Sequence, residues 1–152
     1  MREILFRAKA VSNKQWVRGS LLKDEKGMCY VGTYLKIEKK TGLALMAREQ
    51  GKTHNRFVGM GFVQVDPETV CQFTGMTDKN GVQIFEGDIV EFKRINAMGW
   101  TQQRTGDVRY YDELPIFYIM AITGDAWDWC DCFDIEVVGN IFDDPEFLKG
   151  EQ

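Results

Sequence analysis

Residues 69–92, with the sequence TVCQFTGMTDKNGVQIFEGDIVEF, decide the fold of this 152-residue chain. The dipeptide Asn80-Gly81 favours the positive φ values that a type I′ hairpin turn requires at both central positions. Beyond it, apolar and polar residues alternate over Ile84–Phe92 with the period of a β-strand. The stretch therefore predicts a β-hairpin that continues into a further strand.

Segments of similar length and pattern occupy most of the remaining chain. The 15 glycines and 3 prolines favour short strands joined by turns. We predict strands over the segments Glu3–Ala8, Gln15–Lys23, Met28–Ile37, Arg56–Val65, Thr69–Thr74, Gly106–Tyr111, Ile116–Ile122 and Ile135–Phe142. Their spacing predicts a mainly β protein with minor α content, in which a short-strand meander precedes a small bent sheet or SH3-like barrel.

Three segments depart from the strand pattern. Good helix formers at residues 43–50, followed by Gly51 as a stop signal, predict one short helix. Near the C-terminus, Pro145 after two aspartates predicts a single helical turn that docks Phe147 and Leu148. The sequence assigns no element to residues 93–103 (KRINAMGWTQQ), where Met98 and Trp100 are candidate contact residues.

Length and charge describe the organisation of the chain. A chain of 152 residues has the size of a single domain, residues 1–152, with a sub-division into residues 1–66 and 67–152 as an alternative. Residues 1–66 contain 13 Lys and Arg against 6 Asp and Glu (net +7), and residues 67–152 contain 6 against 17 (net −11). Either the two halves neutralise one another, or the basic half binds a polyanion and the acidic half presents carboxylates to a basic protein.

The N-terminus and the hydropathy pattern predict a cytoplasmic protein. No run of about 18 apolar residues is present to span a membrane. The opening MREILFRAKAV alternates charged and apolar residues and lacks the apolar core of a signal peptide. In the reducing cytoplasm we expect free thiols at Cys29, Cys71, Cys130 and Cys132.

The segment Asp66–Val90, DPETVCQFTGMTDKNGVQIFEGDIV, resembles the signature of the YopX family of phage and prophage proteins. Three further segments resemble the same family: residues 2–8, Trp16-Val17 and residues 135–146. Residues 38–60 and 93–134 carry no such similarity, and Arg7-Ala8-Lys9 departs from the aromatic residue that usually follows the opening alanine in this family.

The resemblance implies a predominantly β protein of phage or prophage origin that self-associates and has no established enzymatic activity. Its motif contains six polar residues of undefined role: Gln72, Thr74, Asp78, Asn80, Glu86 and Asp88. Asp78 and Asn80 belong to the expected hairpin turn. Short polar side chains such as Thr74 and Asp88 often bond neighbouring turn amides, which is the structural alternative to a functional role.

Aspartates recur at every third position in the stretch GDAWDWCDCFD, at Asp125, Asp128, Asp131 and Asp134. Clustered carboxylates bind Ca²⁺ or Mg²⁺ and perform acid–base chemistry. Neither a helix nor a strand gathers all four, so we predict no metal ligand set here. Asp128 and Asp131 are kept as the candidates should a divalent cation bind. The alternative is a solvated acidic loop flanked by two tryptophans.

Zinc binding and catalysis find less support in the sequence. On a strand, Cys130 and Cys132 point to one face, but the chain has no CxxC pair and His54 is its single histidine. Small buried hydrophobes are the alternative role of these cysteines. No nucleophile elbow, phosphate loop or dinucleotide fingerprint is present, so we predict no cofactor and favour a non-enzymatic protein.

Basic and aromatic residues alternate in the N-terminal half. Phosphates attract basic groups and bases stack on aromatic rings, so a β surface of this composition binds single-stranded nucleic acid. The candidate residues are Arg7, Lys9, Lys14 and Arg18. The acidic total, net −4, argues against this reading.

Three functional hypotheses follow from the sequence. The preferred one is a phage or prophage accessory protein that acts through self-association and contact with host or phage proteins, because short strands leave edges that a second subunit covers. The alternatives are a nucleic-acid-binding module that uses the basic half and a divalent-metal site at the acidic segment.

Overall fold

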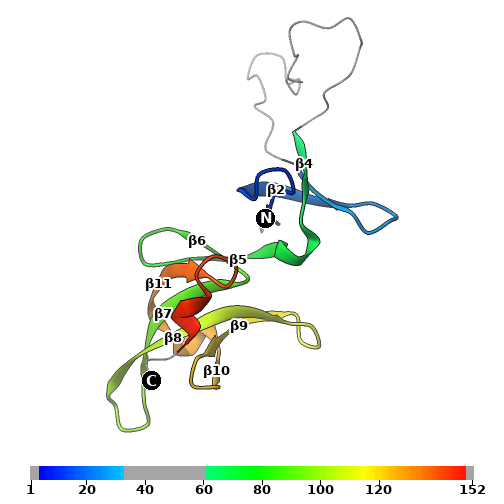
Figure 1. The fold of residues 1–152 in the computed structure, drawn as a ribbon. Helices are drawn as coiled ribbons and strands as arrows, with labels where there is room; N and C mark the ends of the chain where they lie inside the picture. The colour runs from blue at the N-terminus through cyan, green and yellow to red at the C-terminus, as the bar shows by residue number, and fades with distance from the viewer. Residues whose placement is uncertain (1–3, 33–60, 150–152) are drawn as a thin grey trace, which may run out of the picture. The chain divides into compact units, whose positions relative to one another are not determined.

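A computed structural model describes residues 4–32 and 61–149 of the chain. The chain divides into two compact units, an N-terminal unit that ends at Val70 and a C-terminal unit that begins at Cys71 (Figure 1). Helical structure in the described residues is limited to three short 3-10 turns: η1 (Pro67–Thr69), η2 (Trp129–Asp131) and η3 (Pro145–Leu148). The mainly β prediction is confirmed, and the predicted helix at residues 43–50 lies outside the described residues.

Four strands of the N-terminal unit pair in the antiparallel order β4-β3-β2-β1. Their bounds are β1 (Phe6–Lys9), β2 (Trp16–Lys23), β3 (Cys29–Gly32) and β4 (Phe62–Val65). Side chains alternate between the two faces of a strand, and one face of this sheet is buried around Ala8, Val31 and Val65. The first three strands follow one another as the predicted meander.

The C-terminal unit begins with the predicted hairpin of β5 (Cys71–Thr77) and β6 (Gln83–Phe85). A five-stranded antiparallel sheet follows in the order β10-β9-β8-β7-β11. Its strands are β7 (Asp88–Ile95), β8 (Thr101–Tyr111), β9 (Ile116–Ala121), β10 (Ala126–Trp127) and β11 (Phe133–Asn140). Two register shifts between β7 and β11 bend the sheet, and its edge strands β10 and β11 do not pair with each other. The unit is therefore an open bent sheet.

The core of the C-terminal unit lies on one face of this sheet. Phe92, Val108 and Ile119 are almost completely inaccessible to solvent, and Ile84 of the hairpin packs with them. Gly106 permits a close approach of β8 and β9, because a Cβ atom at this position would lie 2.5 Å from the carbonyl oxygen of Met120. Burial of this apolar surface is the main stabilising contribution to the unit.

The β5–β6 turn differs from the predicted type I′ turn. Among its residues only Gly81 has a positive φ, of 82°, and Asn80 does not. The Gly81 amide donates to the Asp78 carbonyl over 3.0 Å, and the Asp78 amide donates to the Val82 carbonyl over 2.8 Å. The loop is therefore a three-residue connection with glycine in the left-handed position. The Asp78 carboxylate stabilises this loop conformation, because its Oδ1 accepts hydrogen bonds from the amides of Asn80 and Val82.

Three other expectations are corrected by the structure. The segment Ile84–Phe92 forms two strands because a turn at Glu86-Gly87, with Gly87 at φ 75°, separates β6 from β7. Residues 93–103 belong to a long hairpin of β7 and β8 whose turn spans residues 96–100. Phe147 does not dock, since it is 47% exposed and no residue of the four-residue turn η3 is buried.

No helix in the described part of the chain is both long and apolar enough to cross a lipid bilayer.

Candidate functional site

Strand β9 of the C-terminal unit presents two different faces. Residues 117, 119 and 121 point into the core, so Ile116, Tyr118 and Met120 point away from it. These three side chains line a groove of about 500 Å³. Its remaining wall comes from Tyr111, Leu114, Ala126, Trp127, Asp128 and Asp131.

The groove offers apolar and aromatic surface to solvent. The rings of Tyr111 and Tyr118 meet edge to face with their centroids 6.4 Å apart. Leu114 is 59% exposed and Ile116 is 45% exposed. A concave surface of aromatic rings and aliphatic side chains is typical of a site that binds an apolar group.

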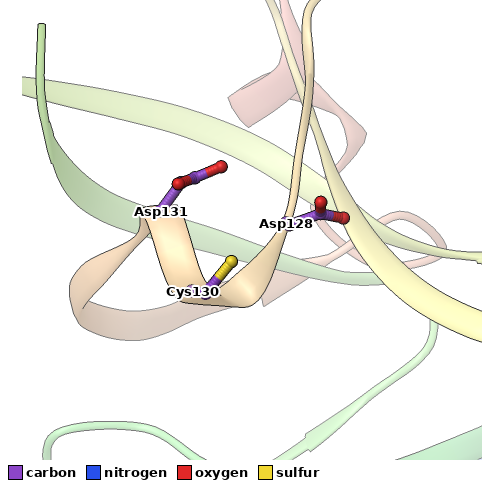
Figure 2. Close-up of side chains that lie close together, drawn as sticks. All are labelled: Asp128, Cys130 and Asp131. Atoms are coloured by element: carbon purple, nitrogen blue, oxygen red, sulfur yellow. The ribbon is translucent and has the colours of Figure 1, made fainter.

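Carboxylates form one lip of the groove. Asp128 precedes turn η2, and Asp131 is its last residue. Ligand atoms of Asp128, Cys130 and Asp131 all lie within 4.8 Å of one another, and Figure 2 shows the three side chains next to one another around the turn. All three residues are exposed, so the lip presents negative charge to the solvent beside the apolar wall.

The structure brings together two of the four aspartates that the sequence offered for a divalent cation, Asp128 and Asp131. Asp125 instead accepts the Thr123 hydroxyl over 3.0 Å, and Asp134 pairs with the Lys93 ammonium over 2.9 Å. Ca²⁺ takes six to eight oxygen ligands, and two exposed carboxylates beside a thiol supply few of them. The arrangement thus resembles the alternative considered above, a solvated acidic turn.

The four cysteines do not gather into a zinc site in the described residues. Cys29 is buried in the N-terminal unit and Cys71 is buried in the C-terminal unit. Cys130 lies within turn η2 and Cys132 follows it, so the expected placement of both on one strand face is wrong. Burial, together with the neighbouring Asp131 carboxylate, raises the pKa of Cys132 to about 11. His54 lies outside the described residues.

Trp127 separates the groove from a second hollow of about 340 Å³, which Arg94, Cys130 and Asp131 also line. The Arg94 guanidinium carbon lies 3.4 Å from the centroid of the Trp127 ring. This cation–π contact holds the indole in place as the shared wall of both hollows. The indole Nε1 is buried and has no hydrogen-bond partner among residues 4–32 and 61–149.

The polar residues of the family motif lie within the β5–β6–β7 framework, away from the groove lining. Thr74 donates its hydroxyl to the Ile84 carbonyl over 2.8 Å and accepts the Met76 amide. The carboxylate of Asp88, which is 1% exposed, accepts the Phe85 amide over 2.8 Å. Thr74 and Asp88 therefore bond main-chain groups of the same framework, as expected if their role is structural and not functional.

The remaining motif residues form bonds within the β5–β6 hairpin and from its turn to β11. The carbonyl of Gln72 accepts the amide of Glu86, and burial raises the pKa of the Glu86 carboxyl. Asn80 donates its side-chain amide to Glu136 on β11 over 3.2 Å. Asp78, which is 6% exposed, accepts the amide of Val137 on the same strand. The motif thus fixes the hairpin against β11.

Basic residues of the N-terminal unit gather on one face of β1 and β2. Lys9 lies opposite Trp16, and Arg7 lies opposite Arg18 in the antiparallel register. The Arg7 guanidinium lies 4.7 Å from the centroid of the Trp16 ring, and the Lys9 ammonium lies 5.4 Å from it. Lys14 is not part of this face because it sits in the connecting turn, with its ammonium 3.9 Å from the Asp66 carboxylate.

The apolar lining of the groove could not be identified from the sequence. Residues 116–122 read IFYIMAI, a run so uniformly apolar that it does not tell which alternate positions face the core. Tyr118 was the available signal, because a buried tyrosine needs a partner for its hydroxyl and therefore favours the outer face. The acidic lip, by contrast, was already visible as the aspartate repeat.

Two of three comparisons with known proteins find a match. The family model described as YopX protein matches residues 5–149. The crystal structure of protein EF1440 from Enterococcus faecalis is similar over 97% of this chain and 99% of that chain, with a TM-score of 0.58 and 24% sequence identity. A search of curated proteins finds no match. At this identity the likeness to EF1440 concerns the fold.

Proposed function

The chain belongs to the YopX family, and from this premise we propose that it is a non-enzymatic phage or prophage accessory protein of the host cytoplasm that acts by binding protein chains, its own copies included. The contact site in this proposal is the groove of the C-terminal unit. The observation that carries it is an exposed apolar and aromatic groove with a carboxylate lip.

Physical chemistry supports a protein segment as the occupant. Apolar burial contributes roughly 25 cal/mol per Å², so a side chain that fills the groove gains binding energy without any catalytic group. Aromatic anchors such as Tyr111 and Tyr118 are typical of contact sites between proteins. The carboxylates of Asp128 and Asp131 favour a segment that carries lysine or arginine next to its apolar residue.

The solution mass of two matched variants tests this proposal. Ile116 lines the groove and is 45% exposed, whereas Ile122 is outside the groove lining and is 43% exposed. Ile116→Glu places a charge against the apolar wall, and we expect it to reduce the light-scattering mass to that of one chain. Ile122→Glu adds the same charge at equal exposure and leaves the mass of the wild type. Equal masses for both variants would show that the groove is not the contact site.

A second candidate function rests on a separate observation, the gathering of basic side chains around Trp16 on the β1–β2 face. Guanidinium and ammonium groups bind phosphates, and an adjacent aromatic ring stacks on an unpaired base. The candidate ligand is a single-stranded nucleic acid, and the residues are Arg7, Lys9 and Arg18.

A further inference from the structure

The hairpin of β7 and β8 ends in an apolar tip. Met98 is 83% exposed, Trp100 is 70% exposed and Ile95 beside them is 60% exposed. Large apolar residues that cluster in this way on a protein surface mark a contact site. We define the tip as residues 95–100.

Hydrogen bonds within the turn hold the tip in one conformation. The amide of Asn96 donates to the Trp100 carbonyl, and the Asn96 Oδ1 accepts the amides of Met98 and Trp100 over 3.0 and 2.9 Å. Gly99, at φ 80°, closes the turn with a bond to the Asn96 carbonyl. A segment that is already ordered loses little conformational entropy when it binds, so its apolar side chains are available for docking.

Charge favours the groove as the receptor of the tip. Residues 93–104 contain three basic side chains, Lys93, Arg94 and Arg104, and no acidic one. The lip of the groove carries Asp128 and Asp131. In its own chain the Lys93 ammonium pairs with Asp134 and the Arg94 guanidinium stacks on Trp127. Arg104 bonds the neutral Gln102 side chain, so its charge is the one in this hairpin that matches an acidic lip on another copy.

Strand geometry separates the tip from the outer end of the groove of its own chain. Trp100 immediately precedes β8, and Tyr111 is the last of its 11 residues. At about 3.3 Å per residue these two aromatic residues lie at opposite ends of a strand roughly 35 Å long. Tyr111 and its neighbours Leu114 and Ile116 are thus free to accept the tip of another copy.

We propose that the tip of one copy docks in the groove of a second copy, with Met98 and Trp100 against the apolar wall and the basic hairpin stem beside the acidic lip. This inference rests on the proposed function and names its partner. The two contacting surfaces are different, so each copy keeps one unused tip or groove after pairing. The contact therefore produces a ring or an open chain of copies.

Complementation between two variants tests this arrangement in the full-length protein. Trp100→Ser removes the tip anchor and keeps the groove, and Ile116→Glu blocks the groove and keeps the tip. Val82→Ser is the matched control for the tip variant, because Val82 is 49% exposed and follows the glycine of the equivalent β5–β6 loop. Circular dichroism of each variant establishes that its fold is intact.

The expected result is that each of the two variants alone has the mass of one chain, while their equimolar mixture has the mass of two chains and does not grow further. The Val82→Ser control associates like the wild type. If Trp100→Ser still associates and Ile116→Glu does not, the tip is not the occupant of the groove. The groove itself then remains a contact site. A mixture that stays at the mass of one chain overturns the tip-to-groove pairing.

Discussion

The Asp78 carboxylate of the β5–β6 turn accepts the main-chain amide of Val137 on β11, 59 residues further along the chain, over 3.1 Å. The next residue, Lys79, repeats the connection with its amide donated to the Ile135 carbonyl over 2.8 Å and with its ammonium paired with Glu136. One turn thus fixes the hairpin to the edge strand of the five-stranded sheet. The family motif therefore has a structural role that its turn sequence alone does not reveal.

Asp78→Asn tests this connection. Asparagine occupies the equivalent position of the β7–β8 turn, where its Oδ1 accepts the same two local amides. The local bonds of the turn are therefore kept, while the group next to the Val137 amide becomes a donor. We expect a loss of about 1–3 kcal/mol in the free energy of unfolding, the usual effect of leaving a buried amide unpaired. Asp24→Asn is the control, because within the described residues the Asp24 side chain accepts the local amides of Lys26 and Met28 in a loop of the same form.

The effect of Asp78→Asn depends on pH. Burial by itself raises the pKa of Asp78, and its three amide bonds together with the Lys79 ammonium outweigh this effect and lower the pKa below its ordinary value of 3.8. A carboxyl whose pKa is lowered by folding stabilises the fold above its unfolded pKa, and this contribution is lost as the pH falls through the folded pKa. The melting temperatures of wild type and variant should therefore differ most above pH 4 and converge below it. A constant difference down to pH 2 would contradict the role of the charge.

Alkylation of the thiols tests the geometry of the acidic lip. Cys130 is exposed, whereas Cys29 and Cys71 are buried. Burial and the neighbouring Asp131 raise the pKa of Cys132 to about 11, so little of its reactive thiolate exists at pH 8. Mass spectrometry after iodoacetamide treatment at pH 8 should find Cys130 modified first and Cys132 slowly, with the rate at Cys132 rising up to about pH 11. Equal rates at pH 8 would refute the burial of Cys132.

Arg94→Met tests the wall that the groove shares with the neighbouring hollow. The variant keeps an apolar stem but removes the guanidinium from the Trp127 ring. We expect a loss of about 0.5–2 kcal/mol in the free energy of unfolding and a shift of the tryptophan emission. Lys93→Met is the control, because the Lys93 ammonium pairs with Asp134 at an exposed position and contributes little. Unchanged emission in Arg94→Met would show that the guanidinium does not hold the indole.

Binding of a mixed-sequence single-stranded oligonucleotide tests the second candidate function. Arg7→Glu and Lys9→Glu reverse the charge next to Trp16 and should weaken binding at low salt. The affinity of the wild type should fall steeply as salt rises, because phosphate contacts release counterions. Lys26→Glu, in the β2–β3 turn, makes the same charge change away from this face and serves as the control. Equal effects of all three variants would show that binding depends on the net charge of the protein and not on the β1–β2 face.

The fold was largely predictable because its determinants are local. Alternating residues and turn glycines located nearly every strand, and the Asp78 hairpin was placed correctly although its turn type was not. That error arose because an aspartate at the first loop position directs its Oδ1 to the amides two and four residues on, and this competes with the preference of Asn80-Gly81 for a type I′ turn. The β7–β8 hairpin was missed because the polar run TQQRT hides the pairing of β8 with β7.

The candidate site was less predictable because it depends on which face of β9 meets the core. Tyr118 and Ile116 become groove residues only through the register in which β9 pairs with its neighbours β8 and β10, and composition does not contain that register. Similarly, Arg7 and Trp16 meet through strand register. Met98 and Trp100 were named in advance as candidate contact residues of an unassigned segment, and the structure places both at an exposed hairpin turn.

The most direct test of the contact function is the light-scattering mass of the wild-type protein over a hundredfold dilution series at low and at high salt. We predict a mass that rises above the 17.5 kDa of one chain as the concentration increases. The association should persist at high salt, since apolar burial is not screened by ions. A mass of 17.5 kDa at every concentration and in both salts would contradict self-association and the docking of tip into groove.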